Sequence, residues 1–109
     1  MSRSKGTEAE ERACGFLRSS GFEIIDRNVH SRYGEIDIIA LKEGVLRFVE
    51  VKSAATYEAA LQNITPAKLE RIHMTAQSYM KRHSLDLDYM VDAVIVTPES
   101  PSLLENITL

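Results

Sequence analysis

Hydrophobic residues recur at helical spacing in two stretches of the chain. The first covers residues 8–20, and it follows Thr7, which with Glu10 has the form of a helix-capping box. The second begins at Thr65-Pro66, where Thr can cap the helix and Pro can occupy its first position. Its apolar positions continue to about His83. The pattern therefore predicts two amphipathic helices.

Four shorter stretches are rich in apolar and β-branched residues, which is typical of strands. They lie at residues 22–25, 34–41, 45–51 and 89–97. Residues 53–64 fit neither pattern, and the segment from residue 102 can add a short strand or helix. The order of helix, strand, hairpin, helix and strand predicts one α/β domain over residues 1–109, with a central mixed β-sheet flanked by helices.

The second and third apolar runs flank Lys42-Glu43-Gly44, which is a hairpin signal. If Glu43-Gly44 is a two-residue turn, paired positions sum to 87 and Asp37 lies directly opposite Glu50. Lys52 points to the same face as Glu50, because strand side chains alternate. The predicted apolar neighbours on that face are Ile39, Leu41, Leu46 and Phe48. The opposite face is predicted to carry Ile36, Ile38, Val45, Val49 and Val51.

Two opposed carboxylates near an apolar face destabilise a sheet unless a shared proton, a protein cation or a metal ion compensates them. Lys52 can neutralise part of the charge, and Mg²⁺ would do so more fully through carboxylate oxygens. Such a site suits phosphodiester hydrolysis. The alternative is structural: Glu50 and Lys52 form a plain ion pair and Asp37 caps a turn. A shift of one residue in the pairing register of the two strands would also send one carboxylate to the opposite face of the sheet.

Charge is distributed unevenly along the chain. The net charge is −3, which argues against a protein that coats nucleic acid non-specifically. Residues 1–84 nevertheless hold all 13 Lys and Arg residues against 11 acids, whereas residues 85–109 hold 5 acids and no Lys or Arg. A local basic surface is therefore compatible with the acidic total.

The composition also narrows the protein class. With 44% hydrophobic and 27% charged residues, the chain resembles an ordinary globular protein. It has neither an apolar membrane span nor an apolar leader, so we expect a cytoplasmic protein with no membrane partner. Cys14 is the one cysteine and is expected to be a buried thiol. The three scattered histidines argue against a zinc site, and no glycine loop for nucleotide phosphates is present.

The hairpin residues also carry a family resemblance. The segments Gly34-Glu35-Ile36-Asp37-Ile38-Ile39-Ala40 and Phe48-Val49-Glu50-Val51-Lys52 resemble the signature of the YraN family of bacterial proteins. That family is placed in the restriction-endonuclease-like PD-(D/E)XK nuclease superfamily, which has a three-layer α/β fold. The likeness extends over nearly the whole chain and includes Lys68 and Asp92.

The resemblance implies roles for individual residues. Asp37 and Glu50 would be metal ligands, with the Val51 carbonyl as a third, and Lys52 would be the catalytic lysine. Glu10 matches a first-helix acid that often completes such sites, although its place in the capping box is an alternative explanation. Mg²⁺ is the implied cofactor, and Mn²⁺ is a second candidate.

Three other positions bear on the same site. Glu35 is predicted to point away from Asp37 and to serve a supporting or surface role. Lys68 can reach a phosphate or can be an ordinary surface lysine. The family often has a basic residue two positions after the lysine, and this chain has Ala54 there, which puts a phosphate contact in doubt.

Two functions follow from these expectations. The first is a Mg²⁺-dependent endonuclease that cleaves DNA, on branched or damaged substrates by analogy with resolvases, and that works as a homodimer. The second is a catalytically weak or inactive module that kept the nuclease fold and binds nucleic acid or another partner. The complete Asp, Glu and Lys set favours the first, whereas the acidic net charge and Ala54 favour the second.

Overall fold

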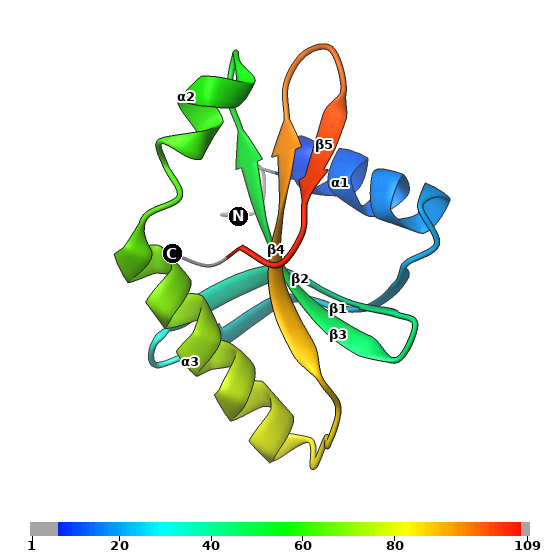
Figure 1. The fold of residues 1–109 in the computed structure, drawn as a ribbon, viewed down its shortest axis with the longest axis vertical. Helices are drawn as coiled ribbons and strands as arrows, with labels where there is room; N and C mark the ends of the chain where they lie inside the picture. Colours follow the sequence, from blue (N-terminus) through cyan, green and yellow to red (C-terminus); the bar gives the residue numbers. More distant parts are fainter. Residues whose placement is uncertain (1–6, 108–109) are drawn as a thin grey trace.

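A computed structural model describes residues 7–107 of the chain and shows an α/β fold (Figure 1). The predicted helices and strands are present, with two additional short elements. In chain order the elements are α1 (Thr7–Ser19), β1 (Glu23–Ser31), β2 (Gly34–Lys42), β3 (Val45–Ser53), α2 (Tyr57–Leu61), α3 (Pro66–Arg82), β4 (Tyr89–Val96) and β5 (Pro101–Leu104).

The five strands form one mixed sheet in the order β1-β2-β3-β4-β5. Neighbouring strands are antiparallel except β3 and β4, which are parallel. A parallel pair needs a crossover connection, and α2 and α3 supply it. The two hairpin strands β2 and β3 lie inside the sheet, as their continuous apolar runs predicted.

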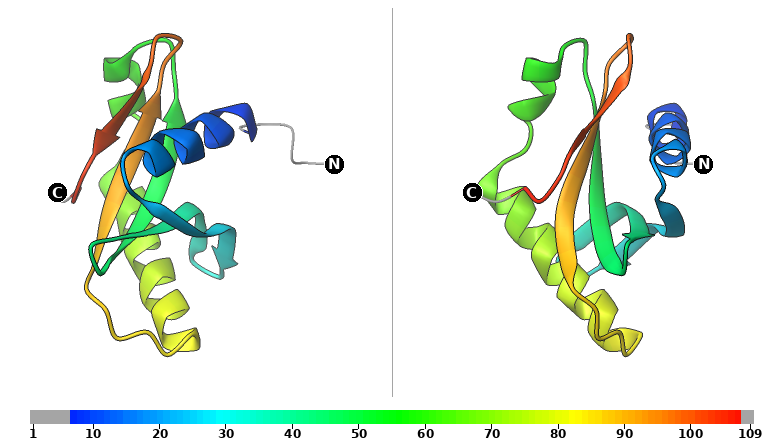
Figure 2. Two further views of the ribbon diagram at one scale, coloured as in Figure 1. Left: turned by 90° about the vertical axis from the view of Figure 1, so that its right-hand side faces the viewer. Right: turned by 45° about the vertical axis from the view of Figure 1, so that its right-hand side comes forward.

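Helices cover both faces of the sheet, which gives three layers (Figure 2). α1 packs on one face through Ala13, Cys14 and Leu17, and α3 packs on the other. Cys14 is fully buried, as expected, and burial raises the pKa of its thiol. The mixed sheet flanked by helices confirms the predicted fold class. None of the helices in residues 7–107 is long and apolar enough to cross a membrane.

The first strand is longer than its apolar run predicted. β1 extends from Glu23 to Ser31 and forms a hairpin with β2 through a turn at residues 32–33. β1 is an edge strand, and most of its residues are exposed or only partly buried, so its second half is polar and carries no hydrophobic signal. The ambiguous segment 53–64 contains the short α2, and the tail adds β5. The side chain of Thr7, the hydroxyl of the predicted capping box, lies outside the described residues.

The hairpin between β2 and β3 has the predicted register. Glu43 and Gly44 have φ values of 55° and 79°, as a two-residue type I′ turn requires. Ile38 pairs with Val49, and this register holds up to Lys42 and Val45 next to the turn. Asp37 and Glu50 are therefore the next positions in the predicted alignment, where the pairing of the two strands ends.

One predicted face assignment in β2 is wrong. The sequence predicts that Ile36 and Ile38 share a face, but Ile38 packs on the α1 side and Ile36 packs with the α3-side core. Asn28 of β1, opposite Asp37 in the local register, has a left-handed φ of 53°, and these two residues are not a pair of the ladder, although the register itself shifts elsewhere, between Ile24 and Asp26. The irregularity at Asn28 and Asp37 interrupts the alternation on which the prediction for Ile36 depended.

Candidate active site

The predicted acidic residues lie where β2 separates from β3, under the first turns of α3. A cavity of about 280 Å³ opens at this point. Its lining includes Gly34, Glu35, Asp37, Glu50, Lys68 and Arg71. Residues from β2, β3 and α3 therefore meet at one opening, where the pairing of β2 with β3 ends.

Asp37 bridges the separating strands through its side chain. Its Oδ2 accepts a hydrogen bond of 2.8 Å from the backbone N–H of Val51. Burial first, and then the negative charge of Glu50, raise the pKa of Asp37 to about 7, whereas the Val51 hydrogen bond opposes the shift. Asp37 is thus a carboxyl group that changes charge near neutral pH.

Glu50 and Lys52 form an ion pair on β3, with 3.1 Å between Glu50 Oε2 and Lys52 Nζ. Their side chains are 18% and 21% exposed. Burial opposes the charge of Lys52, but the hydrogen bond and attraction from Glu50 outweigh it, so the pKa of Lys52 is raised. Lys52 therefore stays protonated at neutral pH, close to both carboxyl groups.

α3 adds two cations to the opposite rim of the cavity, Lys68 and Arg71. The Lys52 ammonium group lowers the pKa of Lys68, which indicates that the two lysines are close together. Sequence reasoning proposed Lys68 as a phosphate contact but missed Arg71. The sequence pattern that could have identified Arg71 is its spacing of three residues from Lys68, which places both side chains on one side of a helix.

Glu10 lies near the site but does not converge on it. It makes an ion pair of 3.6 Å with Arg27, and its charge makes a smaller contribution to the raised pKa of Asp37. In residues 7–107 no three His, Cys, Asp or Glu side chains are close enough to hold a metal ion together. The participation of Glu10 in the site therefore remains a prediction.

Two neighbouring positions complete the surroundings of the site. Glu35 lines the cavity together with Asp37, and its negative charge also raises the pKa of Asp37. The expectation that it points away from Asp37 does not follow from strand alternation, because residues two positions apart share a face. Ala54 packs against an apolar cluster formed by Ala60, Ala93 and Ile95. A basic residue at position 54 would have to leave that cluster to reach a phosphate.

The donor atoms fit a hard divalent cation. Asp37 uses one oxygen for Val51, and its Oδ1 makes no hydrogen bond within the described chain. Glu50 uses Oε2 for Lys52, which leaves Oε1 available. Val51 lies beyond the last β2–β3 pair, so its carbonyl is outside that ladder. Mg²⁺ and Mn²⁺ prefer such oxygen ligands and retain coordinated waters, and a cation would relieve the repulsion between the two carboxylates.

Comparisons with known proteins identify relatives over the full domain. Residues 9–96 match the model of a family described as "Uncharacterised protein family UPF0102". A UPF0102 protein of Sulfurimonas denitrificans is 58% identical over 109 residues, which cover all of both chains. A UPF0102 protein of Wolinella succinogenes is 51% identical, again over the full length of both chains. One from Helicobacter pylori is 50% identical over 106 residues, 97% of this chain and 92% of the relative.

Proposed function

The chain belongs to the UPF0102 family, the YraN family, and from this premise we propose that it is a Mg²⁺-dependent endonuclease that hydrolyses DNA phosphodiester bonds. The observation that carries the proposal is the pKa of Asp37, which burial and Glu50 raise to about 7 beside a protonated Lys52. Strongly shifted carboxyl groups in a cavity are typical of catalytic sites.

Asp37 and Glu50 would hold the metal ion, together with the Val51 carbonyl. When bound, such a cation would supply positive charge for a phosphate group and would lower the pKa of a water molecule. Asp37 must lose its proton before it can bind the metal ion, and its pKa is about 7. We therefore expect activity to rise as the pH increases through about 7. Glu10, if it joins the site, would do so as a supporting acid from α1.

Lys52 would stabilise negative charge that develops at the phosphate. Its ammonium is fixed by the 3.1 Å ion pair to Glu50, so little reorganisation is needed during the reaction. Lys68 and Arg71 on α3 line the same cavity and provide further positive charge there. Ala54 stands at the position where the resemblance implies a basic residue. Lys68 and Arg71 can bind phosphates next to the scissile bond.

We further propose that the substrate is branched or damaged DNA in the cytoplasm, and that two copies act together. A junction or flap presents two strands, and one cavity of about 280 Å³ per chain can engage only one of them. A homodimer would place two sites on such a substrate.

The experiment is a cleavage assay on labelled junction, flap, duplex and single-stranded DNA with Mg²⁺ or Mn²⁺. We expect cleavage by the wild-type chain and a loss of at least about a hundredfold for Lys52→Met, the range for removal of one electrostatic group. Glu50→Gln should lose a similar amount, because it removes a ligand charge.

Arg18→Ala is the matched control, because Arg18 is exposed on α1, away from the cavity. It should cleave like the wild type. Cleavage that survives Lys52→Met would indicate a contaminating enzyme, and a wild-type chain that binds the cation but cuts none of these substrates would exclude the proposed activity.

The second candidate is a binding module without efficient catalysis. Ala54 favours it, since the packing of this residue in an apolar cluster removes one expected phosphate contact. In that case Lys52→Met would leave DNA binding unchanged, and no substrate would be cleaved by the wild type.

A further inference from the structure

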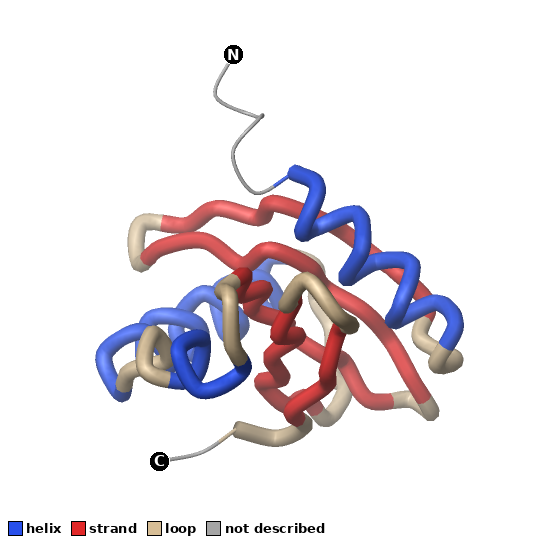
Figure 3. Tube along the Cα trace, turned by 90° about the horizontal axis from the view of Figure 1, so that it is seen from above, coloured by secondary structure: helices blue, strands red, loops and turns tan. Residues whose placement is uncertain are grey.

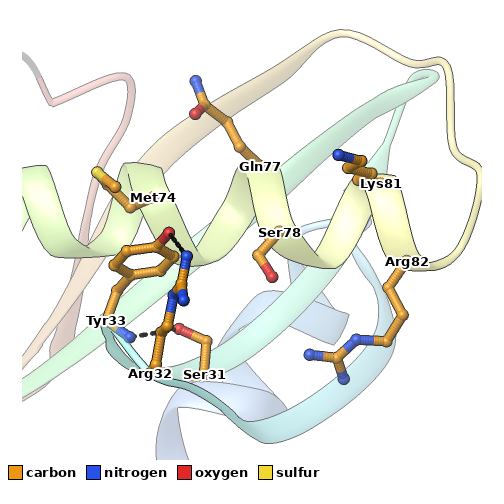
Figure 4. A pocket seen from close by; sticks show the side chains of 8 residues that line it. All are labelled: Ser31, Arg32, Tyr33, Met74, Gln77, Ser78, Lys81 and Arg82. Atoms are coloured by element: carbon orange, nitrogen blue, oxygen red, sulfur yellow. Dashed lines mark hydrogen bonds between the residues drawn. The ribbon is translucent and has the colours of Figure 1, made fainter.

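A second concave surface lies between α3 and the β1–β2 turn, separate from the acidic cavity. Its volume is about 520 Å³. Figure 4 shows the turn residues on one side and the helix residues on the other. We call it the turn groove, and its relevant lining residues are Ser31, Arg32, Tyr33, Ser78, Lys81 and Arg82.

The turn groove is positively charged, although the chain as a whole is acidic. Arg32, Lys81 and Arg82 contribute three cations, and none makes an ion pair with any residue in the range 7–107. Arg32 instead donates a 3.0 Å hydrogen bond to the Tyr33 hydroxyl, and its guanidinium lies 5.1 Å from the centroid of that ring. The groove therefore offers a half-buried aromatic ring and cations that have no counter-ion among the described residues.

The turn groove continues the basic rim of the acidic cavity. Lys68, Arg71, Ser78 and Arg82 are separated along α3 by steps of 3, 7 and 4 residues, which keeps them on one side of the helix. Lys68 and Arg71 line the cavity, and Ser78 and Arg82 line the groove. At 1.5 Å per residue this path is about 21 Å long, enough for several nucleotides of an extended strand.

We propose that the turn groove binds a single-stranded segment of the nucleic acid whose scissile phosphate lies in the acidic cavity. Proteins bind single strands by combining a positively charged groove with aromatic side chains on which bases stack. The groove has both features, and its volume is within the roughly 300–1,000 Å³ typical of small-ligand pockets. It can admit one or two unstacked nucleotides but is far too small for a duplex.

This inference rests on the proposed nuclease function, because it assigns the groove to the same substrate. It also narrows that substrate to DNA with unpaired nucleotides beside the cleaved bond, such as a flap or an open junction. Binding can be measured without metal, so it is separable from cleavage.

The test is fluorescence anisotropy in EDTA with a short fluorescein-labelled oligodeoxythymidine and a blunt duplex of equal length. We expect the wild type to prefer the single strand, and Arg32→Ala/Arg82→Ala to bind it about tenfold more weakly. The slope of log affinity against log salt should become shallower by about 1.4, because two phosphate contacts are lost. Tyr33→Ala should also weaken binding about tenfold, whereas Tyr33→Phe should not, because stacking needs only the ring.

Arg18→Ala is again the matched control for the loss of a positive charge, and circular dichroism should show that every variant is folded. The proposal is overturned if the wild type does not bind the single strand, if it binds the duplex equally well, or if Arg18→Ala weakens binding as much as the groove variants. Single-strand binding by a chain that cleaves nothing would retain the groove and remove only the nuclease function.

Discussion

One fully buried and one half-buried aspartate show two different ways to keep a carboxyl group in a small domain. Asp92 of β4 is fully buried, and Asp37 lies at the end of the paired part of β2. Burial raises the pKa of both carboxyl groups. They differ in how well hydrogen bonds and neighbouring charges stabilise the ionised carboxylate.

The hydrogen bonds of Asp92 favour its charged form, although burial outweighs them and its pKa is raised. Its Oδ1 accepts a 2.8 Å hydrogen bond from the Asn106 backbone, and its Oδ2 accepts one of 3.1 Å from Arg47. Both interactions oppose the effect of burial on its pKa. Arg47 also bonds to Glu105 at 2.9 Å, so this cluster fastens the residues after β5 to the sheet. Asp92 is therefore a structural residue.

The surroundings of Asp37 leave its charge uncompensated. One backbone N–H stabilises the carboxylate, but Glu50 repels it, and Lys52 is paired with Glu50. This arrangement destabilises the folded chain when Asp37 is ionised. A bound cation would reverse that effect, so the comparison separates a group that serves the fold from one available for function.

The largest effect should come from breaking the satisfied cluster. Asp92→Ala leaves the Arg47 guanidinium, 6% exposed, without its buried partner, and we expect the free energy of unfolding to fall by about 3–5 kcal/mol. Urea denaturation followed by circular dichroism measures it.

Asp92→Asn is the companion variant if Asp92→Ala does not fold. It keeps the shape and can still accept from Asn106, so the loss should be smaller, about 1–3 kcal/mol. A loss below about 1 kcal/mol for Asp92→Ala would show that this cluster does not hold the fold, and the contrast with Asp37 would disappear.

Asp37→Asn should instead raise the free energy of unfolding, because it removes the repulsion between Asp37 and Glu50. The pKa of an aspartate is near 3.9 in the unfolded chain and about 7 for Asp37 in the folded one. Between these values the folded state binds more protons, so wild-type stability falls as the pH rises from 4 to 7. Three units correspond to about 4 kcal/mol at most, and solvent screening should reduce the gain of Asp37→Asn at pH 8 to about 2 kcal/mol.

Thermal or urea unfolding at pH 5 and pH 8 measures the difference in stability between Asp37→Asn and the wild type. This difference should be much smaller at pH 5. Adding Mg²⁺ at pH 8 should stabilise the wild type more than Asp37→Asn and narrow the gap. If the variant is no more stable than the wild type at pH 8, Asp37 does not carry the repulsion assigned to it.

The sequence was sufficient to predict the contacts near the β2–β3 turn. Glu43 and Gly44 favour one turn type, which fixes the register and brings Asp37 towards Glu50 and Lys52. It was insufficient farther from the turn, since the irregularity opposite Asp37 lies at Asn28, which has a left-handed φ of 53° in the polar half of β1. Ile36 was therefore assigned to the wrong face.

Residues that come together from distant segments were the second limit. Arg71 joins the acidic cavity only because α3 crosses the end of β2. Arg32 and Arg82 line one groove only because β1 and β2 extend past the other strands as a pair (Figure 3). A helical pattern shows which residues share a side of α3. It does not show which part of the sheet that side faces.

The smallest effect should come from the exposed member of the satisfied cluster. Glu105 is 51% exposed, and Glu105→Gln leaves Arg47 paired with Asp92. Exposed ion pairs contribute about 0–1 kcal/mol, so unfolding should change by less than about 1 kcal/mol. Hydrogen exchange is the sharper measurement, because the amide of Ile107 donates to the Val91 carbonyl at 2.7 Å, two residues after Glu105. Faster exchange at Ile107 with unchanged global stability would show that Glu105 holds only the chain end. A loss of unfolding free energy as large as that of Asp92→Ala would mean that the cluster acts as one unit. In that case the exposure of a residue in the cluster would not determine its contribution to stability.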